Sequence, residues 1–259
     1  LSSKAKEPTG ASEYTDDESD ALESFLLPKK AGVQRAAWDL NWKGAEMIPN
    51  ARLDSGYPLI GPPAVPGTYT ARLTVDGKTQ QTTFKLLPDP RSPVSQQDLE
   101  AQLAFALEVR DEITRLTRTV IQLKRIRRQL AERDELLADN TQAGDLVKGS
   151  KDLIAKLDDL ESRLQNPKAE VVYDILAMKG GAKLYSRLAP LLDTVKTGDG
   201  APTEGMRQVF AVQKKELDGD VAELQGLIDK DLASLNATAA KLSLPTVWVP
   251  PVGAAVPVM

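Results

Sequence analysis

The chain contains no cysteine and no histidine among its 259 residues. These two absences exclude disulfide bonds, thiol nucleophiles, zinc sites built from the usual side chains, and every Ser-His-Asp or Cys-His catalytic arrangement. Long hydrophobic runs are also missing, since none approaches the roughly 20 residues that a membrane-spanning helix needs. A chain without cysteine suits both the cytosol and the bacterial envelope, so this absence does not fix the compartment.

Charge of one sign is in small excess only, because the net charge is −4. Such a balance predicts neither a polyanion nor a polycation as the partner. The hydrophobic content of 41% and the charged content of 27% are typical of a globular protein with a buried core. The length allows one large domain or two of ordinary size.

The clearest local pattern lies in residues 66–78, which predict a β-hairpin. Polar residues alternate there with Tyr69, Ala71, Leu73 and Val75, as in a half-buried strand. Asp76-Gly77 is typical of a type I′ turn, in which both central residues have positive φ. A returning run over residues 79–87 places Phe84 and Leu86 on one face.

The residues before this hairpin predict further strands of the same sandwich. Residues 32–42 form a strand candidate in which Trp38 and Leu40 share one core-facing side, and residues 44–66, rich in Gly and Pro, predict a long ordered loop. Three to four strands are fewer than the roughly seven of an immunoglobulin domain. We therefore expect a partial immunoglobulin- or fibronectin-like β-sandwich whose missing strands precede Leu1, and so a fragment of a longer protein.

The residues after Asp89 predict helices. Apolar residues recur at steps of three and four, and Ser95 with Asp98 forms a weak capping box for the first helix. The fold class is α+β with several domains, the second being an antiparallel four-helix bundle with two long helices. The expected helices span residues 95–138, 145–165, 183–196 and 202–242, with a linker at 171–181; the expected domains are 1–90 (sandwich), 91–243 (bundle) and 244–259 (extended docking tail).

A basic run on the first long helix is the most prominent charged feature. It indicates either a surface for nucleic acid or anionic lipid, or a solvated face paired with acids of a neighbouring helix. No aromatic residue interrupts the run and the net charge is negative, so we favour the second interpretation and expect no nucleic-acid partner. The run comprises Arg115, Arg118, Lys124, Arg125, Arg127 and Arg128, and the acids expected to pair with it are Glu216, Asp218, Asp220 and Glu223.

Three other stretches resemble functional motifs without matching them. Acidic residues 7–24 lack the ligand spacing and mid-loop glycine of an EF-hand, so we expect a solvated excursion. The acids of 158–161 and 111–112 are expected to point outward and serve solubility rather than glycoside hydrolysis. The glycines of 180–183 lack the P-loop pattern and predict a helix-entry turn. The sequence therefore assigns no catalytic, cofactor-binding or metal-binding residue.

Several motifs together resemble the C-terminal region of large bacterial secreted proteins. These proteins carry a sortilin-type or sialidase-like β-propeller with Asp-box (BNR) repeats, and are often labelled glycosyl-hydrolase-like. The resemblance implies a periplasmic, extracellular or envelope location and a propeller upstream that holds any hydrolase site. No Asp-box pattern occurs here, so no family site residue carries over. The motifs are Gly32-Val33-Gln34-Arg35-Ala36-Ala37-Trp38-Asp39-Leu40, Gly61-Pro62 through Pro66-Gly67-Thr68-Tyr69-Thr70, Val75-Asp76-Gly77-Lys78, Pro88-Asp89-Pro90-Arg91, and Leu244-Pro245-Thr246-Val247-Trp248-Val249-Pro250-Pro251.

Three functions follow as hypotheses. The first is a non-catalytic accessory module that supports the propeller or mediates contacts between proteins. The second is a stabilising part of a full-length hydrolase-like enzyme whose site lies upstream. The third is a subunit of a larger envelope assembly, with another chain completing the open sheet edge. All three predict a protein partner, no cofactor and no integral membrane segment.

Overall fold

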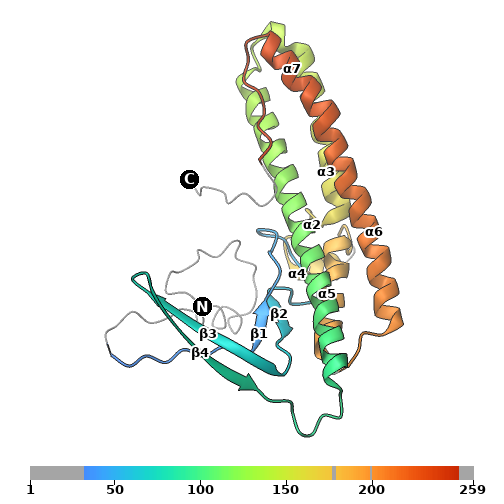
Figure 1. The fold of residues 1–259 in the computed structure, drawn as a ribbon. Helices are drawn as coiled ribbons and strands as arrows, with labels where there is room; N and C mark the ends of the chain where they lie inside the picture. Colours follow the sequence, from blue (N-terminus) through green and yellow to red (C-terminus); the bar gives the residue numbers. More distant parts are fainter. Residues whose placement is uncertain (1–31, 177–178, 199, 251–259) are drawn as a thin grey trace.

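The computed structural model describes residues 32–176, 179–198 and 200–250. It shows a mixed α+β architecture in which long helices lie side by side and a β-hairpin projects away from one end (Figure 1). The acidic stretch 7–24 lies outside the described residues. Among the described residues the helices confirm the predicted pattern closely, whereas the β region differs from it.

The longest element is α2 (Gln96–Leu136), whose 41 residues extend over roughly 60 Å at the α-helical rise. Ser95 caps it as predicted, because its Oγ accepts a hydrogen bond from the backbone N–H of Asp98 at 3.1 Å. Its inward stripe alternates steps of three and four, so one face stays buried along the whole helix. The fully buried members of the stripe are Val109, Ile113, Leu116, Val120, Leu123, Ile126 and Leu130.

Shorter helices cover this stripe. Helices α3 (Gly144–Leu164) and α5 (Leu184–Thr197) pack against α2. The core is completed by a long helix of three parts: α6 (Glu204–Gly226), η2 (Leu227–Leu232) and α7 (Ala233–Lys241). Two short elements, η1 (Thr141–Ala143) and α4 (Val172–Leu176), lie in the connections. These bounds confirm the four expected helices to within two residues at each end, and the 171–181 linker contains the short helix α4.

The segment η2 is a π-helical turn inside the long helix. Buried positions of α6 advance by three or four residues up to Leu227, but the next one, Leu232, comes five residues later. An α-helix would carry that position off the core side, whereas a π turn holds one extra residue. The N–H of Ala233 accordingly bonds to the carbonyl of Ile228, five residues back. The core stripe continues into α7 because of this turn.

The hairpin consists of β3 (Gly67–Val75) and β4 (Lys78–Leu86), paired antiparallel in the predicted register with Val75 opposite Lys78. Asp76 and Gly77 have φ of 48° and 77°, so the type I′ turn is confirmed. Both faces of the hairpin are largely exposed, however. Leu73, Val75 and Phe84 are 55%, 55% and 40% exposed, so the described chain does not cover the apolar face.

The strand predicted over residues 32–42 is wrong for most of its length. Only β1 (Asn41–Lys43) forms, and it pairs with β2 (Ile60–Pro63), which lies inside the stretch predicted as a loop. Leu40 has a φ of 61°, which ends an extended strand, and its side chain is 42% exposed rather than in a core. The two sheets of the described residues are each two-stranded and separate from one another.

Trp38 is half-buried and belongs to an aromatic cluster at the base of the hairpin. Its ring lies 5.2 Å from that of Tyr69 and 6.2 Å from that of Phe84, and its indole N–H donates to the carbonyl of Asn41 at 3.0 Å. Edge-on and tilted arrangements of this kind are the favourable ones for aromatic rings. Trp38 therefore anchors the hairpin locally instead of centring a sandwich core.

The loop between β1 and β2 packs into the helical core. Ala45 and Ile48 are 4% and 3% exposed and join the same apolar cluster as α2. Thr117 on α2 donates to the carbonyl of Glu46 at 2.8 Å, and Arg118 binds the Glu46 carboxylate at 2.6 Å. Gly56, with φ of 88°, lets this loop approach the α5 backbone where a Cβ would collide. The loop thus fixes the β region onto the helices.

Candidate functional site

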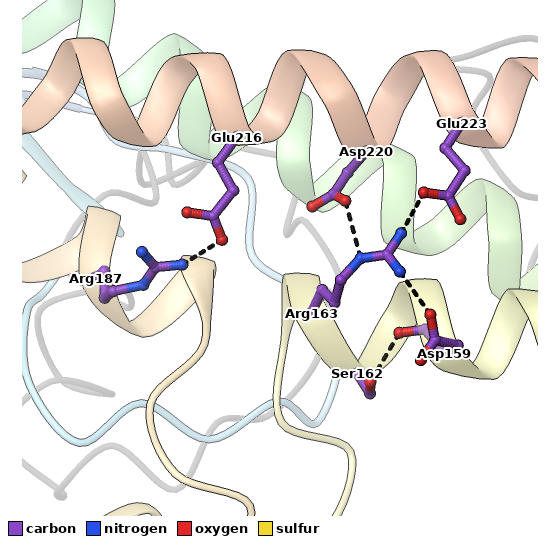
Figure 2. A network of polar contacts seen from close by, with 7 residues as sticks. All are labelled: Asp159, Ser162, Arg163, Arg187, Glu216, Asp220 and Glu223. Carbon is purple, nitrogen blue, oxygen red and sulfur yellow. Dashed lines mark hydrogen bonds and ion pairs between the residues drawn. The ribbon is translucent and has the colours of Figure 1, made fainter.

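Arg163 on α3 is the centre of a polar network between α3 and α6 (Figure 2). Its Nε donates to the Asp220 carboxylate at 3.1 Å, and its Nη atoms bind Asp159 and Glu223, each at 2.5 Å. Burial lowers the pKa of Arg163 and the hydrogen bond with Asp220 raises it, with a net rise. The guanidinium is therefore a permanent cation that holds three carboxylates from two helices.

Asp220 is the buried member of this network, with its side chain 9% exposed. One carboxylate oxygen, Oδ2, is buried and has no hydrogen-bond partner among the described residues. Burial raises the pKa of Asp220, and the hydrogen bond from Arg163 opposes that rise. A buried carboxylate held by a single arginine makes the α3–α6 contact depend on its charge.

The basic run of α2 is paired mainly with acids, but with different ones from those expected. Only Asp218 of the fourth-helix acids reaches it, at 2.6 Å from Arg115, while Glu216 binds Arg187 of α5 (Figure 2) and Asp220 and Glu223 bind Arg163. Arg125 has no ion pair among residues 32–176, 179–198 and 200–250. The remaining pairs are Arg118 with Glu46, Lys124 with Glu161, Arg127 with Asp158 and Glu161, and Arg128 with Glu132.

Two of the acids expected at the surface are buried instead. Glu161 is 1% exposed and is held by Lys124 at 3.2 Å and Arg127 at 2.5 Å. Glu112 is 9% exposed and binds Arg115 at 2.9 Å. Burial of a carboxylate requires a paired cation. Glu161 of α3 is paired with two cations of α2, whereas Glu112 is paired with Arg115 of its own helix and with Lys214 of α6 at 3.7 Å. Sequence spacing alone could not show the burial of Glu161, because both of its cations lie on another helix.

The glycine pair before α5 forms a turn, as predicted. Gly180 and Gly181 have φ of 90° and 69°, and Asn166 donates to the carbonyls of Lys179 and Gly181 at 2.9 and 3.1 Å. The side-chain amide of Asn166, just after the end of α3, therefore binds two carbonyl groups of the turn. A Cβ at Gly180 would meet the Asn166 side chain, so the turn needs glycine there.

The C-terminal tail docks on the molecule's own helices, as its apolar composition predicts. After α7 the chain reverses and runs back along α2 (Figure 1). Asn236 of α7 accepts from the N–H of Val247 at 2.8 Å and donates to its carbonyl at 2.9 Å. Gln129 of α2 does the same for Trp248, at 3.0 and 2.9 Å. These contacts belong to residues 244–250 of the predicted tail, and residues 251–259 lie outside the described residues.

The hairpin offers the main uncovered surface of the β region. Strands β3 and β4 have nine residues each and pair only with one another among the described strands. The outer edge of each strand therefore presents backbone N–H and C=O groups with no strand beside them. The exposed apolar residues Leu73, Val75 and Phe84 lie on one face of this same element.

Among the described residues, no helix combines the length and apolar character needed to cross a membrane. Nor does that part of the chain contain a cluster of three or more acidic side chains arranged to hold a metal ion. The polar groups that do converge are arginine–carboxylate pairs between helices. Their common geometry is that of structural cross-links.

Comparison with known proteins gives no relative. No protein-family model matches the chain, and neither the curated proteins nor the solved structures contain a significant match.

Proposed function

We propose that this chain is a non-catalytic interaction module in which hairpin β3–β4 is the surface offered to a protein partner. The observation that carries the proposal is an element of two nine-residue strands with open edges and an exposed apolar face. Open edges of this length are templates for an added strand. The helices, joined by buried ion pairs, serve as a rigid support.

The partner completes the sheet that the hairpin begins. We infer that its strands, together with β3 and β4, form the immunoglobulin- or fibronectin-like sandwich that the sequence pattern indicates, beside the antiparallel four-helix bundle. An upstream β-propeller of the same polypeptide is one source of those strands, and another chain of an envelope assembly is the other. The resemblance of the sequence motifs supports the propeller and a periplasmic or extracellular location.

The ion pairs support a non-catalytic role. Glu161 and Asp220 are the most enclosed acids of the helical region, and each is held by arginine from a neighbouring helix. An acid–base pair for hydrolysis needs two carboxylates facing a substrate across an open cleft. The arrangement of these carboxylates instead favours cross-linking of helices.

Site-specific photo-crosslinking in the producing cell tests the proposal. A photoreactive residue at Leu73 on the hairpin should capture one defined protein segment, whereas the same residue at Val212, 66% exposed on α6, should not. In a hairpin with a two-residue turn, the N–H of Gln81 points to the outer edge. Gln81→Pro should therefore abolish the adduct from Leu73 without unfolding the helices.

The identity of the adduct separates the sources of the partner. A crosslink to a segment upstream of Leu1 supports the propeller, and a crosslink to a separate chain supports the assembly subunit. Equal adducts from Leu73 and Val212 would contradict sheet completion by the hairpin, and an adduct that persists in Gln81→Pro would contradict a partner strand at the outer edge of β4.

A further inference from the structure

The tail lies on a surface of α2 and α7 that includes Gln122, Gln129 and Asn236, here called the groove. We propose that this groove is a binding site for extended peptide that accepts the tail of a second copy of this chain, so that two molecules exchange tails. The inference rests on the docking contacts and on the hinge that precedes them. It is independent of the hairpin and of the partner proposed for it.

The groove recognises main-chain atoms. Asn236 and Gln129 lie on different helices, and each uses its amide as donor and acceptor to the backbone of one tail residue, Val247 and Trp248 respectively. Gln122 adds a bond to the carbonyl of Pro250 at 3.1 Å. The amides of Asn236 and Gln129 each accept from the N–H and donate to the carbonyl of the same tail residue. Such a pair of bonds does not depend on the side chain of that residue, so it can form with any extended segment of the same backbone geometry.

Side-chain selection involves Val247 and Pro250, which are buried, and Val249, which packs partly buried against the main apolar cluster. Val247 is 5% exposed and belongs to the main apolar cluster, whereas the next residue, Trp248, is 65% exposed. Pro245 and Pro250 flank the pair and favour an extended chain around it. The ligand class is therefore an extended segment with a small branched residue between prolines, and the tail of an identical molecule matches it fully.

The hinge before the tail supplies the reason for exchange. Helix α7 ends at Lys241, and the chain reverses through Ser243, which has a φ of 56°, before the N–H of Leu244 bonds to the carbonyl of Ala239 at 2.9 Å. A serine in the left-handed region carries a steric cost that glycine lacks. When the turn at Ser243 extends, that steric cost is removed, and the tail can make the same docking contacts in the groove of the second copy.

Short, strained hinges of this kind favour domain swapping. Each contact of the closed monomer is made again in the exchanged dimer, so protein concentration and hinge strain decide between the two forms. Exchange should therefore increase with concentration and decrease when the hinge is relaxed.

The absence of native cysteine makes the test direct. The Gln129→Cys and Trp248→Cys chains, each full length, are mixed, unfolded and refolded together, and then oxidised. Exchange brings the two thiols together between molecules at an effective concentration of about 1 mM or more, so the mixed disulfide dimer should exceed that of a control mixture about tenfold at 0.1 mM protein. The control pairs Trp248→Cys with Val212→Cys, an exposed position on α6. Equal yields from the two mixtures would overturn the proposal.

A single chain that carries both substitutions shows whether the pair can reach. Its internal disulfide at low concentration confirms that Cys at 129 and 248 are close when the tail is docked. If that bond fails to form, light scattering of the wild-type protein across a concentration series decides instead.

The light-scattering measurement compares the wild-type protein with Ser243→Gly. We expect the wild-type dimer to grow with concentration and Ser243→Gly to raise its dissociation constant about tenfold, because glycine relaxes the closed hinge. A wild-type monomer at every concentration would overturn tail exchange. So would a dimer that Gln81→Pro abolishes and Ser243→Gly leaves unchanged, since the hairpin would then be its interface.

Discussion

Helix α2 and hairpin β3–β4 carry equally regular apolar patterns, yet one is covered and the other is not. The α2 stripe is fully buried from Val109 to Leu130, because three other helices bring matching stripes to it. Among the described residues, Trp38 packs on the apolar face of the hairpin near its base, and Leu73 and Val75 stay exposed. The spacing of apolar residues therefore predicts which face of an element is suited to burial. It does not identify the element or the partner that covers this face.

The largest effect expected from this contrast is on core truncations. Leu116→Ala removes a fully buried side chain from α2 and should lower the free energy of unfolding by about 2–5 kcal/mol. Leu73→Ala on the hairpin should change it by about 0.5 kcal/mol or less. Urea denaturation followed by circular dichroism measures both. Similar losses for the two variants would show that the hairpin is packed in solution.

A smaller difference is expected between buried and exposed ion pairs. Arg163→Ala leaves the buried carboxylate of Asp220 without its partner and should cost about 1–3 kcal/mol. Arg128→Ala breaks a pair with Glu132 in which both side chains are more than half exposed, and should cost about 0.5 kcal/mol or less. Chemical denaturation compares the two variants. An equal cost would mean that the Arg163 network contributes no more than a surface pair.

Trp38→Ala should weaken the hairpin and spare the helices. Each aromatic contact that it loses contributes about 0.5–1.5 kcal/mol. Hydrogen exchange should show reduced protection of β3 and β4 amides, with the α2 amides unchanged. Trp248→Ala is the matched control, because its ring is 65% exposed on the docked tail. Loss of protection throughout the helices would place Trp38 in a shared core after all.

The pH dependence of stability compares a buried and an exposed carboxylate that bind the same arginine, Arg163. Burial raises the pKa of Asp220 above its ordinary value of 3.8, so the folded state binds this proton more tightly than the unfolded state. Stability contributed by the protonated form is lost as pH rises from 3.8 through the folded pKa. Asp220→Asn cannot ionise, so its stability relative to the wild type should increase as the pH rises above 3.8.

Denaturation at several pH values measures that gain. Asp159→Asn is the control, since it removes a charge from the same arginine at a position 69% exposed, and we expect no such gain for it. A constant difference between Asp220→Asn and the wild type across the range would contradict the role of burial at this carboxylate.

The helices were predictable because their signals are local. Steps of three and four residues, the Ser95 cap, and Pro167 and Pro245 after α3 and α7 indicate α2, α3, α5 and the long C-terminal helix without reference to the rest of the fold. The strand over 32–42 failed for a nonlocal reason. Among the described strands, β1 pairs with β2, which lies in a Pro- and Gly-rich stretch, and the left-handed backbone at Leu40 interrupts the extended run before β1.

The candidate sites divide in the same way. The docked tail followed from its apolar composition, but the amides that hold it, Asn236 and Gln129, carry no sequence signal of that role. Burial of Glu161 was likewise hidden, since its charge resembles that of any solvated acid until Lys124 and Arg127 are placed beside it. Pairings between distant helices become visible only with the fold.

The π turn at Leu227–Leu232 has a consequence for changes in chain length. Deleting one residue from an α-helix rotates everything beyond it by about 100° and moves a buried stripe off its core. Within this turn, a deletion would instead convert the π geometry to ordinary α geometry, while the five-residue step between buried positions becomes a step of four. The long helix therefore contains one place where losing a residue preserves the alignment of both its halves.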